Sequence, residues 1–183
     1  MSLISRLLGK RADTREAARP LWHRVVEIAR EKPWYAQCGI ADTVAGRFDA
    51  VTLVMALVML RMERDKNAPT GVEGVTGDAL IEPSVRLTEL FVEDMDGQLR
   101  QSGVGDLGVG KRMGQLMSVL GGRIGALRDA LKHDDAALVE ALDRNVTLIE
   151  GADKARLAAK VRQLHAQIDA LSDEDLLAAR IER

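Results

Sequence analysis

The sequence predicts an all-α protein, a single bundle-like domain of about six to eight helices. Apolar residues recur at helical spacing over nearly the whole chain, and no segment shows the strict alternation of a strand. The length of 183 residues suits one domain with one core, and 46% hydrophobic with 30% charged residues is a globular composition. We expect a basic amphipathic segment at residues 1–13, followed by a helical domain at residues 14–183.

The first predicted helix begins at Thr14, a residue type favoured as an N-cap, and ends near Lys32. Leu21, Val25 and Ile28 form its buried side. The preceding segment is basic, and residues 1–32 carry 8 basic and 4 acidic side chains. This end of the chain is therefore suited to an anionic surface.

A turn-like stretch at residues 33–39 leads to a predicted central helix at residues 47–64. That helix is apolar almost all round, which is typical of a helix buried by its neighbours. Residues 65–81 are rich in Gly, Pro and Asn and lack any period, so we expect a mobile loop there.

Helical period resumes after this loop and continues to the end of the chain. A Gly-rich turn at residues 103–110 separates two of the helices, and Ser172 with Asp175 three positions on is typical of a helix start. The remaining predicted helices cover residues 83–102, 111–132, 136–149 and 153–171, with a short last helix from Ser172.

Composition excludes several classes of protein. The net charge is −2 and five aromatic residues are too few for a serial base-stacking surface. Cys38 is the single cysteine, so an internal disulfide and a multi-cysteine metal site are excluded. No apolar run reaches the length of a membrane-spanning helix, and the N-terminus lacks the apolar core of a secretory signal. We expect a cytoplasmic protein without metal or cofactor.

Two nucleotide-binding patterns overlap in the Gly-rich turn. Gly103, Gly105 and Gly108 spell G-x-G-x-x-G, and Gly105, Gly110 and Lys111 spell G-x-x-x-x-G-K. Both patterns need a preceding strand, whereas the preceding element here is a predicted helix. We therefore expect a structural turn, in which Gly103 or Gly105 ends one helix and Asp106 caps the next.

Other chemical groups support no catalytic site. His23, His133 and His165 are far apart in the sequence, and Cys38 beside an apolar segment is typical of a small core residue. The carboxylates of residues 93–96 point in different directions on a helix, as expected of a solvated face.

Methionines recur at helical spacing on two predicted helices. Met is flexible and common on surfaces that accept varied apolar partners, although filling gaps in a core is the more frequent role of any single Met. We predict an apolar binding surface beside the loop of residues 65–81, with that loop as a movable cover. Its residues are Met55, Met59, Met62, Met113 and Met117.

Three ordered motifs resemble one known family. The first is G-I-A-D-T-V-A-G-R-F-D at residues 39–49. The second is F-V-E-D-M-D-G-Q-L-R-Q-S-G-V-G-D-L-G-V-G-K-R-M from Phe91, with G-G-R-I-G-A-L from Gly121, and the third is L-D-R-N-V from Leu142. They resemble the signature of the ubiquinol-cytochrome c chaperone family over about residues 33–179. The sequence departs from that signature at Ala45, Gln101 and Leu127.

The resemblance implies a helical assembly factor for respiratory complex III rather than an enzyme. Its client would be newly made cytochrome b, and its partners would include the ribosome or the inner-membrane surface and another assembly factor, with no DNA. It implies a bacterial member in the cytoplasm beside the inner membrane. The motif residues expected to matter are Asp42, Arg47, Phe48, Asp49, Phe91, Asp94, Asp96, Arg100, Gly103, Gly105, Asp106, Lys111 and Arg123.

Buried charges need partners, so we predict that several charged motif residues form one polar network between helices. Its candidates are Asp42, Arg47, Asp49, Asp96, Arg100, Asp106 and Arg123.

Two other classes of function stay open. A helical lipid-binding protein or enzyme would need an apolar cavity with polar groups such as Asp42, Asp49 and Arg123. A ribosome- or nucleic-acid-binding module would need one basic face. Its residues would be Lys111, Arg112, Arg123, Arg128 and Lys132, although their spacing does not place all five together.

Overall fold

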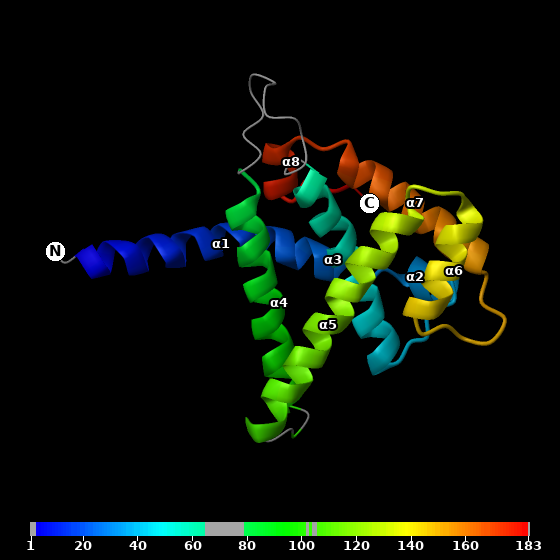
Figure 1. Ribbon diagram of the computed structural model, residues 1–183, viewed down its shortest axis with the longest axis horizontal. Helices are drawn as coiled ribbons and strands as arrows, with labels where there is room; N and C mark the ends of the chain where they lie inside the picture. Colours follow the sequence, from blue (N-terminus) through cyan, green and yellow to red (C-terminus); the bar gives the residue numbers. More distant parts are fainter. Residues whose placement is uncertain (1–2, 65–78, 102, 104–105, 183) are drawn as a thin grey trace.

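The computed structural model describes residues 3–64, 79–101, 103 and 106–182. For residues 3–13, 106 and 107 it describes the backbone alone. These parts of the chain form eight helices and no strand, which confirms the all-α prediction (Figure 1). The helices are α1 (Leu3–Ala29), α2 (Lys32–Ala36), α3 (Val44–Arg64), α4 (Ile81–Gln101), α5 (Asp106–Ala130), α6 (Asp135–Asn145), α7 (Lys154–Asp169) and α8 (Asp173–Leu177).

Helix α3 is the centre of the fold. It contacts α1, α4, α5 and α7, and its residues Leu53 to Val58 are all fully buried. An apolar surface on every side requires neighbours on every side, so the predicted central position is confirmed. Helices α4 and α5 diverge from their connecting turn, and the N-terminal part of α1 extends away from the body (Figure 1).

The start of α1 differs from the prediction. The helix is continuous from Leu3 to Ala29, so Thr14 lies inside it and does not mark its start. The residues before Thr14 also suit a helix, and a favourable N-cap residue does not interrupt a helix that already runs through it. The turn-like stretch after it contains the short helix α2, with Pro33 in its first turn.

The C-terminal helices begin largely as expected. Asp153 caps α7 by accepting a hydrogen bond from the Arg156 amide. Ser172 caps α8 by accepting one from Asp175, which confirms the predicted N-cap. None of the helices within the described residues is long and apolar enough to span a membrane. The expected loop of residues 65–81 lies mostly outside the described residues, and α4 begins at Ile81.

One extended contact ties distant parts of the chain together. Ile40 and Leu148 form an isolated antiparallel bridge. The Ala41 amide donates to the Thr147 carbonyl at 2.9 Å, and the Ile149 amide donates to the Gly39 carbonyl at 2.9 Å. The segment before α3 is thereby fixed against the segment after α6.

Candidate functional site

The first motif folds into the sharp entrance of α3. The Gly46 amide donates to Thr43 Oγ1 at 3.2 Å, so the Thr43 side chain caps the helix. A Cβ atom at Gly46 would lie 1.9 Å from the Ala41 carbonyl oxygen. Only glycine therefore fits where the helix approaches the preceding backbone.

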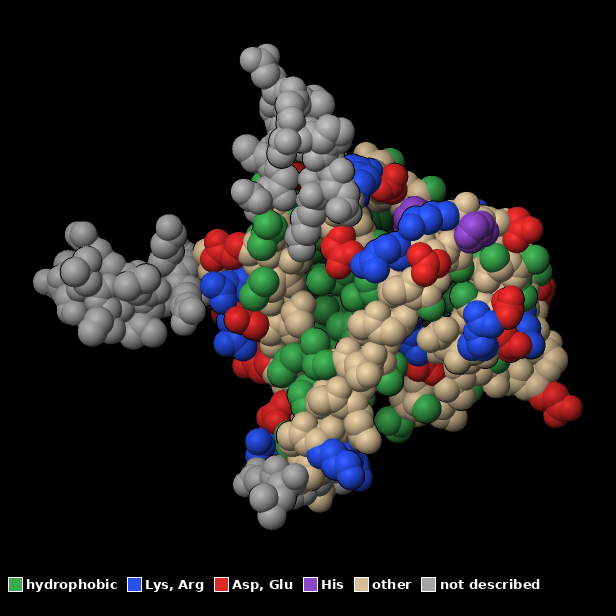
Figure 2. Space-filling model, in the orientation of Figure 1, with side chains coloured by type: hydrophobic (Ala, Val, Ile, Leu, Met, Phe, Trp, Pro, Cys, Tyr) green, Lys and Arg blue, Asp and Glu red, His purple; other side chains and the backbone are tan. Residues whose placement is uncertain are grey.

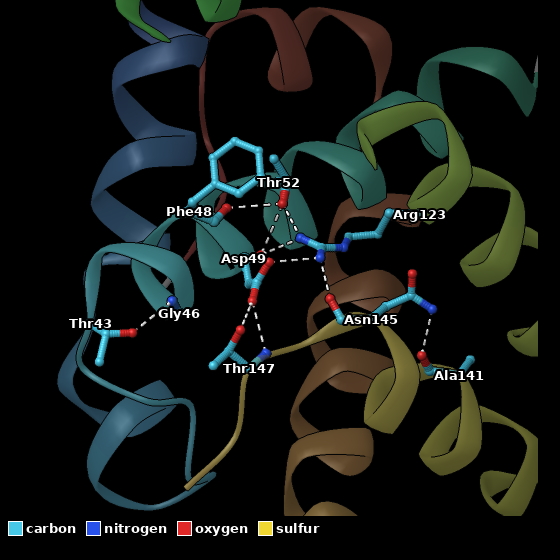
Figure 3. A network of polar contacts seen from close by, with 9 residues as sticks. All are labelled: Thr43, Gly46, Phe48, Asp49, Thr52, Arg123, Ala141, Asn145 and Thr147. Atoms are coloured by element: carbon cyan, nitrogen blue, oxygen red, sulfur yellow. Dashed lines mark hydrogen bonds and ion pairs between the residues drawn. The ribbon is translucent and has the colours of Figure 1, made fainter. Parts of the chain in front are cut away.

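A buried ion pair joins this motif to the second one (Figure 3). Arg123 Nη2 on α5 donates to Asp49 Oδ1 on α3 at 2.8 Å, and Arg123 Nη1 donates to the Asp49 carbonyl at 3.0 Å. The Arg123 side chain is 3% exposed and that of Asp49 12%. The guanidinium also donates to Thr52 Oγ1 and to the Asn145 carbonyl.

The second oxygen of the Asp49 carboxylate is also satisfied. It accepts hydrogen bonds from the Thr147 amide at 2.8 Å and from Thr147 Oγ1 at 2.6 Å. The network therefore links α3, α5 and the segment after α6 (Figure 3). Donors on both carboxylate oxygens balance the cost of burying the charge, so this group holds the helices together.

Four other charged candidates form ion pairs outside this network, and the side chain of the fifth, Asp106, lies outside the described residues. Asp42 and Arg47 form their own exposed pair, with Arg47 Nε 2.6 Å from Asp42 Oδ1. The hydrogen bond from Arg47 lowers the pKa of Asp42 below its ordinary value. Asp96 and Arg100 form a second separate pair along α4 at 2.7 Å. The prediction of one network holds for Asp49 and Arg123 and is wrong for these four residues.

The two phenylalanines of the motifs lie in contact. Phe91 is fully buried, and its ring centroid is 6.4 Å from that of Phe48 and 6.0 Å from that of Trp22. Phe48 is half-buried and reaches the surface. Phe91 is therefore a core anchor, whereas Phe48 belongs to a surface wall.

The Gly-rich turn ends one helix and precedes the next. Gly103 has φ +80°, and its amide donates to the Arg100 carbonyl at 3.0 Å, as expected of a helix C-terminus. Gly105 lies outside the described residues, and the backbone of Asp106 is the first of α5. Lys111 is exposed on α5. The element before the turn is helix α4 rather than a strand, so neither nucleotide pattern has its required context.

The methionines do not form one binding surface. Met55 and Met62 are buried in the core, at 0% and 1% exposure, so the prediction that they lie on a surface is wrong. Helix α3 is covered on every side at their positions, and they fill core volume. Met59, Met113 and Met117 are half-buried. The expected cover, residues 65–78 of the loop, lies outside the described residues.

Met59 and Met113 instead line a hollow between α4 and α5, here called the α4–α5 groove. Its volume is about 1040 Å³. Figure 2 shows hydrophobic side chains gathered in this hollow. Its apolar residues are Met59, Val85, Val92, Val109 and Met113, and its charged residues are Arg15, Arg86, Glu89, Glu93 and Asp96.

A second hollow, here called the motif pocket, lies where the first and second motifs meet. It has a volume of about 1070 Å³ and is walled by parts of α1 to α5 and of the segment before α3. Asp42, Arg47 and Phe48 come from the first motif, and Asp94 and Met95 from the second. The motifs thus build a surface hollow as well as the buried network.

Sequence reasoning missed several residues of these sites. Val85 and Val92 lie seven positions apart on α4 with Thr88 between them, which places all three side chains on one face of the helix. Thr52 and Thr147 gave no sequence signal, because their partners, Arg123 for Thr52 and Asp49 for Thr147, are far away in the sequence.

The family model of the ubiquinol-cytochrome C chaperone matches residues 36–183. The chain belongs to the ubiquinol-cytochrome c chaperone family. The crystal structure of the Cbp3 homolog from Brucella abortus is similar, with 33% sequence identity and a TM-score of 0.75. That similarity covers 98% of this chain and 96% of the Brucella chain. A search of the curated proteins finds no match.

Membership of the chaperone family supports a role as an assembly chaperone. Cys38 is buried, and burial raises the pKa of its thiol, which disfavours the nucleophilic thiolate. Within the described residues no group of three or more His, Cys, Asp or Glu side chains is placed to hold a metal. Arg123 is buried, so it cannot belong to a basic nucleic-acid-binding face with Lys111, Arg112, Arg128 and Lys132.

Proposed function

We propose that this chaperone holds a hydrophobic segment of a newly made subunit of ubiquinol-cytochrome c reductase, with cytochrome b as the client. The role is one of binding and release without catalysis. The observation that carries it is the α4–α5 groove, an apolar hollow on a member of this chaperone family.

The groove suits an apolar segment that must later be passed on. Its aliphatic side chains range from the buried Val109, at 5% exposure, to Val85 at 48% exposure. Covering apolar surface contributes about 25 cal/mol per Å² removed from water, so a few hundred Å² give substantial affinity. Met59 and Met113 adapt to different side chains because their thioether chains are flexible.

Charged residues around the groove limit what else binds there. Arg86 on α4 pairs with Glu89 at 2.9 Å and with Glu82 at 3.3 Å, and Arg15 on α1 pairs with Glu93. These ion pairs keep the edge of the groove hydrated, whereas the base of the groove is apolar. A client segment with polar flanks and an apolar centre matches that pattern.

We place the chaperone in the cytoplasm beside the inner membrane, where such a client is made. The first turns of α1 extend away from the body (Figure 1), and their sequence carries Arg6, Lys10 and Arg11. A basic, partly apolar helix is attracted to anionic lipid. The ribosome and a second assembly factor stay predicted partners without an assigned surface.

Photo-crosslinking tests the groove directly. A crosslinking amino acid at Thr88, inside the groove, should capture cytochrome b during its synthesis. The same amino acid at Val119, which is exposed on α5 outside the groove, is the matched control. Equal capture from both positions, or capture of cytochrome b from neither, would contradict the proposal.

A substitution separates groove binding from folding. Val92→Glu places a charge in the groove from a half-buried position and should reduce recovery of cytochrome b with the chaperone. Val119→Glu should leave recovery unchanged. Thermal unfolding of both variants must stay close to that of the unaltered protein for the result to bear on the groove.

A further inference from the structure

The motif pocket has the lining of a ligand site, and client binding in the α4–α5 groove does not use it. Its walls are mostly apolar, with Val26, Tyr35, Phe48, Val51, Leu99 and Leu116 among them. Its volume of about 1070 Å³ is at the upper end of the range for small-molecule sites. Helices α1 to α5 all contribute to the wall, so five helices rather than two bound the hollow.

Tyr35 shows how apolar the pocket is on its α2 side. Its hydroxyl donates to the Ala29 carbonyl at 2.8 Å, so the polar atom is already engaged and the ring is left to form the wall. Burial raises the pKa of this phenol above its ordinary value of 10.0. Both facts describe a surface from which water is partly excluded.

Around the pocket, some charged side chains form ion pairs and others form none with the described residues. Arg47 is held by Asp42, as described above. Arg30 and Lys32, at the junction of α1 and α2, are exposed and form no ion pair with the described residues. Asp94 lies apart from them, on the α4 wall. One side of the pocket therefore offers two cations to an anionic group.

We propose that the motif pocket binds an anionic single-chain amphiphile, with its acyl chain along the apolar wall and its head group on Arg30 and Lys32. The shared chemistry is a hydrocarbon chain ending in a carboxylate or a phosphate. A helical peptide fits less well, because a helix lying in a groove leaves it at both ends. This site is independent of client binding in the α4–α5 groove.

Titration calorimetry with the full chain tests the proposal, using dodecanoate below its micelle concentration. Saturable binding of one molecule is expected, and affinity should rise up to about fourfold for each methylene added until the chain fills the pocket. Dodecanol, which has the same chain without the charge, should bind about tenfold more weakly. Binding of dodecanol as tight as that of both dodecanoate and the phosphate-headed ligand described below would overturn the assignment of the head group.

Two variants locate the ligand. Ala45→Trp adds bulk to the pocket wall from an exposed position and should abolish binding, while Ala155→Trp, on the exposed side of α7, should not. Replacing Arg30 and Lys32 together by Glu should weaken dodecanoate binding at least about tenfold.

Matched controls account for net charge and for the client groove. Replacing Arg128 and Lys132 by Glu makes the same change of net charge at the far end of α5 and should leave dodecanoate binding unchanged. Val92→Glu in the α4–α5 groove should also leave it unchanged, so a failure of the client proposal is distinguishable from a failure of this one.

A phosphate-headed ligand distinguishes the two sources of the amphiphile. Dodecanoyl lysophosphatidylglycerol tests a membrane-derived lipid, and dodecanoate tests a free fatty acid. Tighter binding of either one than of dodecanol supports the proposal and identifies the head group. Absence of saturable binding of both, or binding that survives Ala45→Trp, would overturn it, as would binding of an amphipathic helical peptide in preference to both lipids.

Discussion

Arg123 on α5 places its guanidinium 2.8 Å from the carboxylate of Asp49 on α3, and the two residues are 74 positions apart in the sequence. Both side chains are almost completely removed from solvent. The pair joins two of the sequence motifs, and its further partners Thr52 and Thr147 extend it to the segment after α6 (Figure 3).

The first prediction concerns this pair. Arg123→Met leaves the Asp49 carboxylate buried without its cation, and removal of one partner of such a pair costs about 3–5 kcal/mol. Arg128→Met, five residues further along the same helix, removes an exposed partner of Glu63 and should cost less than about 1 kcal/mol. Urea unfolding of both variants measures the difference, and equal costs would show that the buried pair does not stabilise the fold.

The second prediction compares two methionines of one helix. Met55→Glu puts a charge into a fully buried position and should destabilise the protein by several kcal/mol. Met59→Glu puts the same charge at the half-buried floor of the α4–α5 groove, where it can reach water. It should weaken client capture with a much smaller effect on thermal unfolding. Similar destabilisation by both would show that Met59 is a core residue.

The third prediction concerns pH. His165 on α7 is half-buried, and burial lowers its pKa below the ordinary value of 6.5. The unfolded chain therefore binds a proton there more readily than the folded one, so this residue reduces stability as the pH falls through 6.5 and below. His165→Gln should lose less stability than the unaltered protein between pH 7.5 and about 5.5, as measured by urea unfolding. An identical loss in both proteins would contradict this account.

The fourth prediction concerns the beginning of α1. Each basic residue near an anionic bilayer contributes about 1 kcal/mol to attachment, so reversing two charges with Lys10→Glu and Arg11→Glu should weaken vesicle binding at least about tenfold. Sedimentation with phosphatidylglycerol vesicles measures the binding. Added salt should reduce the difference in binding between the variant and the unaltered protein. Lys132→Glu with Arg156→Glu changes the net charge equally on exposed sites elsewhere and should have little effect.

Much of the fold was predictable because its signals are local. The apolar run of α3 predicted a central helix, and Ser172 predicted the start of α8. The extent of α1 was not predictable from Thr14, since a residue that favours an N-cap is also tolerated inside a helix. The helical spacing of the methionines likewise did not tell which of them reach the surface.

The sequence indicated which residues belong to the site, but not which of them lie together in the folded protein. Met55, Met59 and Met62 share one sequence pattern, yet Met59 lines the α4–α5 groove while the other two are buried. Asp49 and Arg123 were among seven charged residues, several of which were expected to converge. Which ones meet depends on how distant helices pack, and that information is not local in the sequence.

The buried network also has a consequence for the kinetics of folding. Asp49 and Thr147 are 98 positions apart, so their contact has a high contact order, and we expect it to form after the intervening helices are arranged. Interactions made late stabilise the native state more than the transition state. The network should therefore mainly lower the rate of unfolding. The folded chaperone should then persist for long periods even if its free energy of unfolding is modest.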